Sequence, residues 1–367
     1  MNTVKQYTFE PDYSVHPGEI LGETLKARSI SQSELASRCG ISEKHVSQII
    51  NGKASVSSET ALLFERALGI RASLWMNLES SHQLHIARRA EEARFASFYD
   101  WAKEFPLRSL TQRGWIPQTS NKEEKVRGLL DFFGVSSPAA WEAQYKKLTV
   151  AYRKSPAFTT SMKSIASWLR IGELKAVDIE THRFSKTSFR RSLHRIRQFT
   201  SLDPSEFEPR MKQLCRKAGV ALVFVPELPG THVSGATRWL SSDKALIIQS
   251  LRYRTDDHFW FTFFHEAAHI LLHGKHAIFI DEDLKDVSDE EAKADAFAAN
   301  HLIPKARYDK FVSIRPISRR RVLSFAKELG IAPGVVVGRL QHDGIVPFSW
   351  FHDLKHTLVF AEENEDS

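Results

Sequence analysis

The chain has little cysteine and no long apolar run. Cys39 and Cys215 are its only cysteines and lie far apart, so they form neither a zinc-ribbon spacing nor a disulfide framework. Residues 1–14 lack the apolar segment of a signal peptide, and no stretch of about 18 apolar residues occurs. We therefore expect a soluble, cytoplasmic protein that has no membrane partner.

The composition that is present is typical of a globular protein with more than one domain. The chain has 367 residues, of which 42% are hydrophobic and 26% charged, so it can form two or three apolar cores. Its net charge of +7 and pI of 9.3 favour an anionic partner such as nucleic acid.

An H-E-x-x-H motif, His265-Glu266-Ala267-Ala268-His269, lies in an apolar run with no Gly or Pro before Gly274. That run predicts a buried helix, on which His265 and His269 share one face because they are four residues apart. Two imidazoles on one face can bind one Zn²⁺, and Glu266 would then lie beside the metal-bound water as general base. With 16 His in the chain, chance remains an alternative for the motif alone.

A catalytic zinc needs a third protein ligand, and an acidic, Ala-rich segment follows at residues 288–298. Ser288 and Glu291 form a capping-box pattern that predicts a helix start. We predict Glu291 as the metal ligand and Asp295, one turn later, as acceptor of the other ring N–H of a ligand His. Glu291 as a simple helix cap is the alternative. The competing third ligands are His273, His276, Glu282 and Glu290.

The N-terminal region predicts a helix-turn-helix. Ser31 with Glu34 is a capping box for one short helix, Gly40 permits a tight turn, and Ser42 can cap the next helix. Two short helices joined in this way form the motif whose second helix enters the major groove. The alternative is the solvated face of a small helical bundle. The predicted DNA-binding residues are Gln32, Ser42, Lys44, His45, Ser47, Gln48, Asn51 and Lys53.

Residues 31–53, S-x-S-E-L-A-x-x-x-G-I-S-x-x-x-V-S-x-I-I-N-G-K, resemble the XRE-type DNA-binding fold. With H-P-G-E-I-L at 16–21 and L-W-M-N-L at 74–78, residues 14–80 resemble the HigA group of antitoxins. The resemblance implies a homodimer that represses its own operon on double-stranded, palindromic operator DNA. It also implies a toxin or repressor protein as a further partner.

Three strands are predicted at 220–225, 235–240 and 245–249 before the H-E-x-x-H helix. From about Phe184 to Gln341 the chain resembles the ImmA/IrrE family of metallopeptidases. The resemblance rests on G-A-x-R-W-L, F-W-F-T-F-F-H-E-A-A-H-I-L-L-H, E-A-K-A-D-x-F-A and I-A-P-G-V-V-V-G-R-L-Q. It implies His265, His269 and Glu291 as metal ligands and Glu266 as catalytic base. Asp295 departs from the frequent Asn of the family but suits the same role.

The expected fold is mainly α with a small β-sheet. It comprises an all-α helix-turn-helix domain (1–80), a helical linker and middle region (81–183), an α+β zincin-like metallopeptidase domain (184–345) and a C-terminal extension with an acidic tail (346–367). Helices at 317–329 and 334–341 could mimic a second helix-turn-helix or pack against the peptidase. The basic stretch 190–195 could contact nucleic acid or be solvated.

Two functions compete for this chain. In one it is a DNA-binding regulator whose zinc domain hydrolyses peptide bonds in a regulatory protein. In the other it is a repressor or antitoxin whose zinc domain is a non-catalytic sensor or a toxin-binding scaffold. The presence of Glu266 favours the first, because a structural zinc site needs no general base. The candidates for stabilising the oxyanion are Arg238, His232 and Tyr253.

Overall fold

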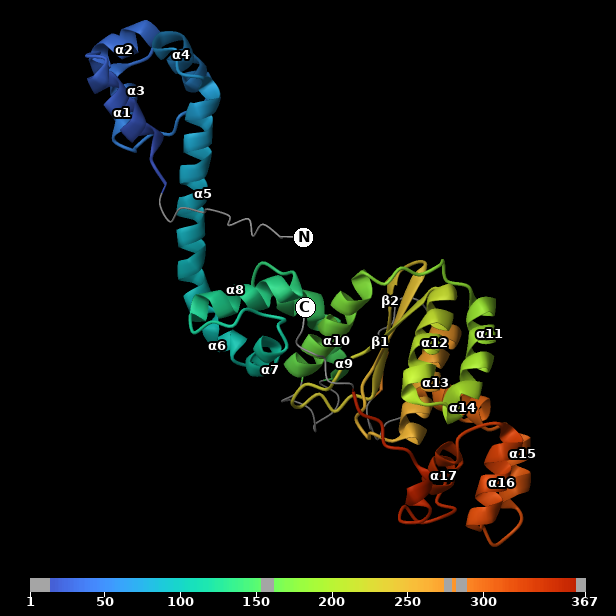
Figure 1. Ribbon diagram of the computed structural model, residues 1–367. Helices are drawn as coiled ribbons and strands as arrows, with labels where there is room; N and C mark the ends of the chain where they lie inside the picture. Colours follow the sequence, from blue (N-terminus) through green and yellow to red (C-terminus); the bar gives the residue numbers. More distant parts are fainter. Residues whose placement is uncertain (1–13, 153–161, 274–278, 282–288, 361–367) are drawn as a thin grey trace, which may run out of the picture. The chain divides into compact units, whose positions relative to one another are not determined.

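A computed structural model of the chain describes residues 14–152, 162–273, 279–281 and 289–360, with side chains left out at 146–152 and 279–281. The chain divides into two compact units, residues 1–99 with 121–126 and residues 100–120 with 127–367. The elements are labelled in Figure 1. Among the described residues, no helix is long and apolar enough to cross a membrane.

The first unit contains five complete helices among its described residues, and the first turn of α8 (Lys122–Phe133). The five are α1 (Pro17–Ala27), α2 (Gln32–Cys39), α3 (Glu43–Ile50), α4 (Ser58–Leu68) and α5 (Ala72–Ser97). The remaining helices are α6 (Tyr99–Ala102), α7 (Leu107–Gln112), α8 (Lys122–Phe133), α9 (Pro138–Tyr152), α10 (Met162–Val177), α11 (Lys186–Arg197), η1 (Gln198–Ser201), α12 (Pro204–Lys217), α13 (Asp256–Leu272), α14 (Asp289–Leu302), α15 (Lys305–Val312), α16 (Arg319–Leu329), α17 (Pro333–His342) and η2 (His352–Leu354). The strands are β1 (Val220–Phe224), β2 (Gly235–Ser241), β3 (Lys244–Gln249) and β4 (Phe279–Asp281).

The predicted helix-turn-helix is confirmed in α2 and α3. Ser31 Oγ accepts the Glu34 N–H at 3.1 Å, and Ser42 Oγ accepts the His45 N–H at 3.2 Å, so each helix begins at a serine cap. Gly40 ends α2 with φ of 66°, a conformation that costs little only for glycine. A full capping box would also have the Glu34 carboxylate accept the Ser31 N–H. Among these described residues the Glu34 carboxylate instead pairs with Arg38.

The small sheet of the second unit has four strands in the order β1-β3-β2-β4. β1 pairs with β3 in parallel, while β2 runs antiparallel to both β3 and β4. The mainly α fold with a small sheet is therefore confirmed. The three predicted strands lie where the β-branched runs place them, and the short edge strand β4 was not predicted.

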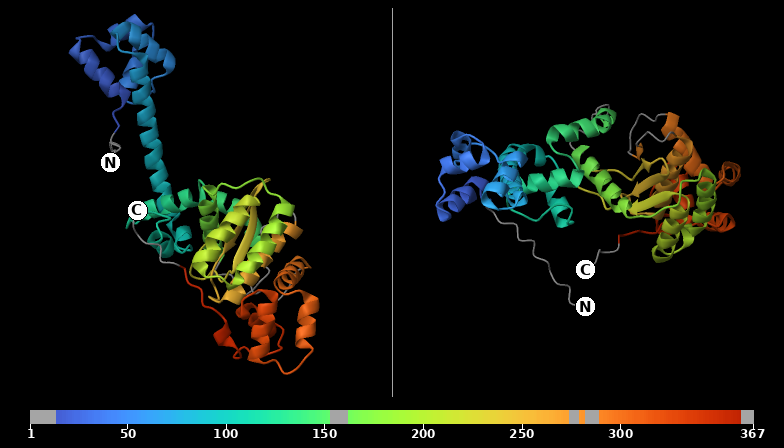
Figure 2. Two further views of the ribbon diagram at one scale, coloured as in Figure 1. Left: turned by 45° about the vertical axis from the view of Figure 1, so that its right-hand side comes forward. Right: turned by 90° about the horizontal axis from the view of Figure 1, so that it is seen from above.

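Helices cover both faces of this sheet (Figure 2). On one face α10 packs so closely that a Cβ on Gly172 would lie 2.3 Å from the side chain of Ile248 on β3. Trp168, also on α10, is fully buried and donates its indole N–H to the Val225 carbonyl at 3.1 Å. α12 and α13 pack on the other face. The second unit is therefore layered, with the sheet between α10 and the H-E-x-x-H helix.

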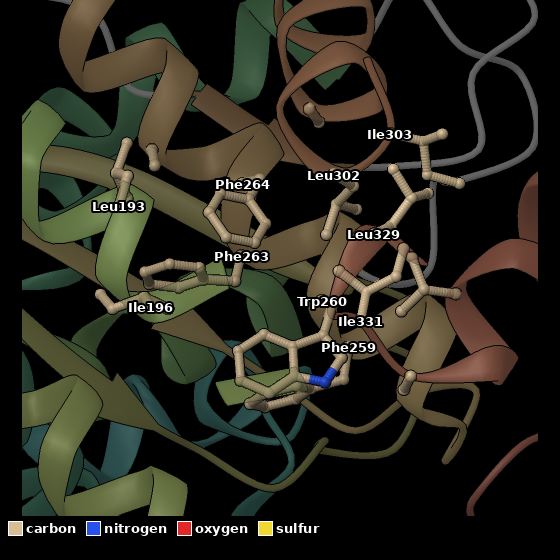
Figure 3. Close-up of a cluster of buried hydrophobic side chains, with 14 of the residues drawn as sticks. Leu193, Ile196, Phe259, Trp260, Phe263, Phe264, Leu302, Ile303, Leu329 and Ile331 are labelled. Atoms are coloured by element: carbon tan, nitrogen blue, oxygen red, sulfur yellow. The ribbon is translucent and has the colours of Figure 1, made fainter. Parts of the chain in front are cut away.

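The largest core lies around α13 (Figure 3). Four consecutive turns of this helix contribute large apolar side chains, and α11, α14, α16 and the following turn pack against them. The labelled members are Leu193, Ile196, Phe259, Trp260, Phe263, Phe264, Leu302, Ile303, Leu329 and Ile331. Burial of this kind holds α13 rigidly, which a site on that helix requires.

The pair α16 and α17 has a helix-turn-helix turn, with Gly330 at φ of 67°, but α17 is a packing helix. A Cβ on Gly334 would lie 2.4 Å from Asp256 Oδ1, and a Cβ on Gly338 would lie 2.3 Å from Asp257 Oδ2. Both aspartates are buried at the N-terminus of α13. The face of α17 that would have to contact DNA is therefore packed on α13. Of the two alternatives for this pair, packing against the peptidase domain is confirmed.

Candidate metal centre and nucleic-acid interface

Two histidines of α13 meet inside the second unit. His265 and His269 are each 2% exposed, and Glu266 between them is fully buried. Their spacing of four residues brings His265 Nε2 to 2.9 Å from His269 Nε2. The ring nitrogens therefore point to one place, as the helical period of the motif predicts.

A carboxylate of α14 completes this group. Glu291 Oε2 lies 3.0 Å from His265 Nε2 and 3.4 Å from His269 Nε2. One turn later, Asp295 Oδ1 lies 2.9 Å from His265 Nδ1. The carboxylate of Asp295 thus accepts the Nδ1 proton and leaves Nε2 of His265 as the acceptor nitrogen toward the cluster. In the part of the chain that the structure describes, no other group of three His, Cys, Asp or Glu converges in this way.

The charges of the cluster suit a cation. Burial disfavours the ionised form of Glu291, but hydrogen bonds with His265 and His269 outweigh burial and lower its pKa to about 2. Burial also lowers the pKa of His269, against the opposing hydrogen bond with Glu291. Neutral imidazoles and ionised carboxylates are the protonation states that bind metal ions.

The donor set fits a zinc ion. Two imidazole nitrogens and one carboxylate oxygen form a known catalytic zinc set. Tetrahedral ligands about 2.0–2.1 Å from one ion are separated by about 3.3 Å. The separations between the His265, His269 and Glu291 ligand atoms are 2.9, 3.0 and 3.4 Å. These residues could therefore hold one zinc ion with little rearrangement.

The position of Glu266 is set by strand β2. Thr237 Oγ1 donates to Glu266 Oε2 at 2.5 Å and also lies 3.1 Å from the Glu266 carbonyl oxygen. A Cβ on Gly235 would lie 2.7 Å from Glu266 Oε1 and 2.8 Å from Thr262 Cγ2. Sequence reasoning missed both roles. The alternation of a strand, which places residues 235 and 237 on one face, is the signal that could have found them.

The same alternation removes one candidate for oxyanion stabilisation. Arg238 follows Thr237 on β2 and so faces α10, where its guanidinium pairs with the carboxylate of Glu173. Our prediction that Arg238 could reach the substrate oxygen is wrong for this reason. Tyr253 is 39% exposed and stacks on His258, beside a depression that extends to Thr262, one turn before Glu266.

The competing third ligands are placed differently from Glu291. Glu290 is exposed at the start of α14, and His273 is the C-cap of α13, with its ring centroid 5.2 Å from that of His269. Neither belongs to the converging group. His276, Glu282 and the predicted cap Ser288 lie outside the described residues.

The predicted DNA-binding residues lie on or beside α3, apart from Gln32 at the start of α2. Two of them already serve the backbone, because Ser42 Oγ is the N-cap and Asn51 Nδ2 donates to the Ser47 carbonyl at 2.8 Å. The aliphatic face of α3 is buried through Val46 and Ile49. The remaining predicted side chains are partly or fully exposed: Lys44, His45, Ser47 and Gln48 on α3, and Lys53 just after it.

Two family models match this chain. Residues 21–75 match the helix-turn-helix family, and residues 224–341 match the IrrE N-terminal-like domain of the peptidase M78 family. The first match contains α2 and α3. The second contains β2, β3, β4, α13 and α14, and therefore every residue of the His265, His269 and Glu291 cluster.

The following known proteins are each similar in sequence to about a fifth of this chain. Virulence-associated protein I of Dichelobacter nodosus is 30% identical over 81 residues, which are 22% of this chain and 75% of that protein. The uncharacterized HTH-type transcriptional regulator YddM of Escherichia coli (strain K12) is 29% identical over 73 residues, 20% of this chain and 78% of that protein. The solved structure of the Pseudomonas aeruginosa antitoxin HigA with the higBA promoter is 32% identical, with a TM-score of 0.22, and covers 22% of this chain and 90% of that one.

Proposed function

This chain belongs to the XRE-type helix-turn-helix regulators and carries an IrrE-like domain of the peptidase M78 family, and we propose that it is an autorepressor of the antitoxin type whose second unit is a zinc-dependent metallo-endopeptidase. The observation that carries the proposal is the convergence of His265, His269 and Glu291 beside a fully buried Glu266. A site that only held a metal for stability would not need Glu266, a second carboxylate in a fixed position beside the ligands.

The regulatory part of the proposal rests on α3. Lys44 and Gln48 lie one turn apart on the exposed side of a helix whose other side is fixed in the core by Val46 and Ile49. Lysine and glutamine are residue types that bind phosphates and base edges in the major groove. One such helix covers a half-site, so we propose a homodimer on a palindromic operator.

The catalytic part rests on the buried cluster. A zinc ion held by His265, His269 and Glu291 would polarise the substrate carbonyl and lower the pKa of a water molecule to about 7. Asp295 holds the His265 ring in the tautomer whose Nε2 faces the ion. Thr237 donates to Oε2 of Glu266 and so fixes the carboxylate that would take the proton of the attacking water.

Glu266 would then pass that proton to the nitrogen of the leaving amine. Its complete burial keeps the carboxylate away from bulk water until substrate arrives. We propose a regulatory protein as substrate, either a partner repressor or residues 85–120 of another copy. In that segment residues 117–120 lie outside helices and are mostly exposed, which suits an extended substrate.

A reporter gene under the promoter upstream of this protein's own gene tests both parts. Lys44→Ala with Gln48→Ala should abolish repression. The control is Arg66→Ala, which also removes one positive charge, from an exposed position on α4, and should leave repression intact. Glu266→Gln should repress normally and fail to derepress under the inducing condition. Repression that survives the α3 substitutions would contradict the proposal that α3 binds the operator. Normal derepression in the Glu266→Gln variant would favour a zinc domain that acts as a sensor or scaffold and not as a peptidase.

A further inference from the structure

Helix α11 carries a row of exposed cations that pair with no carboxylate in the part of the chain that the structure describes. Between Glu180 and Asp203 the chain has no acidic residue. The basic residues of this stretch are Arg183, Lys186, Arg190, Arg191, Arg195 and Arg197. Only Arg197 is tied inward, through the carbonyls of Leu302 and Leu329.

The other members line the outer side of a helix whose inner side is core. Phe189, Leu193 and Ile196 are fully buried, and Ser192 donates to the Leu214 carbonyl at 3.1 Å. Lys186, Arg190, Arg191 and Arg195 are exposed and form no ion pair with any residue that the structure describes. Arg183, just before the helix, makes one long contact of 3.8 Å to Asp243.

The neighbouring helix α12 shows the contrast. It pairs Arg210 with Glu206 at 3.3 Å and Lys212 with Glu208 at 2.5 Å, each four residues apart. On α11 the same spacing joins like charges, Lys186 with Arg190 and Arg191 with Arg195. Like charges at this spacing destabilise a helix, so the arrangement opposes folding and indicates a polyanionic partner that relieves the repulsion.

We propose that the outer face of α11 binds the phosphate backbone of double-stranded DNA. Successive cations four residues apart lie about 6 Å from one another along the helix axis, and most are arginine, which binds phosphate oxygens in a bidentate manner. Contacts to phosphates carry no sequence information, so this face adds affinity without sequence preference. The DNA-binding domain of the same chain keeps a duplex at high local concentration. This second surface goes beyond the proposed function, because it lies in the other unit.

Fluorescence anisotropy of the full chain with a 30-bp duplex of random sequence, titrated over a range of salt concentrations, tests the proposal. Arg190→Gln, Arg191→Gln and Arg195→Gln together should lower the slope of log affinity against log salt by about 3, because each lost phosphate contact removes about 0.9. Affinity at about 0.1 M salt should fall more than tenfold, and thermal stability should not decrease.

The matched control removes three cations that are paired with carboxylates, by Arg210→Gln, Lys212→Gln and Lys305→Gln. It should leave the slope within about 1 of the wild type. Equal effects of the two triple variants would overturn the proposal, since net charge alone would then explain binding.

The Lys44→Ala, Gln48→Ala background separates this surface from the helix-turn-helix. Random-duplex binding should persist there and disappear when the α11 substitutions are added. If that background binds no random duplex, α11 is not a DNA surface, while the proposed repressor function stands. The α11 substitutions could also abolish binding to a labelled polyglutamate peptide while leaving DNA binding unchanged. That result would assign the face to an acidic protein and overturn the proposal.

Discussion

Thr237 donates a hydrogen bond of 2.5 Å to the carboxylate of Glu266, and both side chains are buried between β2 and α13. The contact joins residues 29 positions apart. It holds one carboxylate oxygen, and a neighbouring glycine makes room for the other. The orientation of the proposed general base thus depends on the strand as much as on its own helix.

Replacing Thr237 tests that dependence. Thr237→Val keeps the shape and removes the donor, so we expect kcat for peptide cleavage to fall about 10-fold to 100-fold, the equivalent of a lost hydrogen bond to a charged group. KM and zinc content should not change. Thr237→Ser restores the hydroxyl and should recover most of the rate. If Ser and Val variants are equally impaired, packing rather than the hydrogen bond is what matters.

The metal ligands can be tested by metal analysis of purified protein. His265→Ala, His269→Ala and Glu291→Ala should each reduce zinc below one ion per chain, because each removes one of three protein ligands. Asp295→Ala should weaken zinc affinity about 10-fold to 100-fold without removing a ligand. Glu290→Ala is the control, since this neighbour is exposed and lies outside the cluster. Zinc loss in Glu290→Ala together with full occupancy in Glu291→Ala would show that Glu290, and not Glu291, is the third ligand.

The packing of α17 on α13 gives a stability prediction. Gly338→Ala places a methyl group 2.3 Å from Asp257 Oδ2, and the buried carboxylate cannot move into water. We expect the free energy of unfolding of the second unit to fall by about 1–3 kcal/mol, the usual cost of overpacking. Chemical denaturation followed by tryptophan fluorescence measures this change.

The control is Gly22→Ala in α1, because a methyl group added at this helical glycine meets no close neighbour. Its nearest neighbour, Ile50 Cγ2, would lie 3.6 Å from the new methyl group, and alanine favours a helix over glycine by up to about 1 kcal/mol. The variant should therefore be as stable as the wild type or more so. Equal destabilisation by both substitutions would contradict the close approach of α17 and α13.

Local patterns predicted much of this molecule. The serine caps at Ser31 and Ser42, the turn at Gly40 and the β-branched runs of β1 to β3 depend on neighbours within a few residues, so the sequence displays them directly. The spacing of His265 and His269 likewise follows from the helical period. The cluster with Glu291 and Asp295 could be proposed because those two residues also lie one turn apart.

The remainder depends on contacts between distant segments. Thr237 reaches Glu266 and Arg238 reaches Glu173 only because β2 is placed between α10 and α13. The periodicity of β2 does not indicate which helix covers which face, and so Arg238 stayed among the three candidates for oxyanion stabilisation. The three-residue strand β4 is too short to give an alternation signal.

Acid sensitivity should come in part from His301. Burial, together with the charges of His194 and Arg197, lowers the pKa of His301 to about 4 from 6.5. Below pH 6.5 the unfolded chain therefore binds a proton that the folded chain binds only below about pH 4. The stability due to the neutral ring is complete above that range and is lost as pH falls through it.

Chemical denaturation between pH 4 and 8 measures this effect. His301→Phe, which keeps an aromatic ring against Phe264 and Phe297, should be less sensitive to pH than the wild type over the interval from 6.5 to 4. The difference between the two proteins isolates this residue from other groups. Parallel pH profiles would mean that His301 titrates normally in the folded chain.

We propose above all that this chain binds DNA and also cleaves a regulatory protein, with Glu266 as the general base. The most direct test of this proposal is mass spectrometry of new protein N-termini in cells that carry either the wild type or Glu266→Gln under the inducing condition. The account predicts N-termini within a helix-turn-helix repressor, or within residues 85–120 of this chain, in the wild type alone, with equal zinc content and promoter binding in the two proteins. Identical sets of N-termini would contradict it.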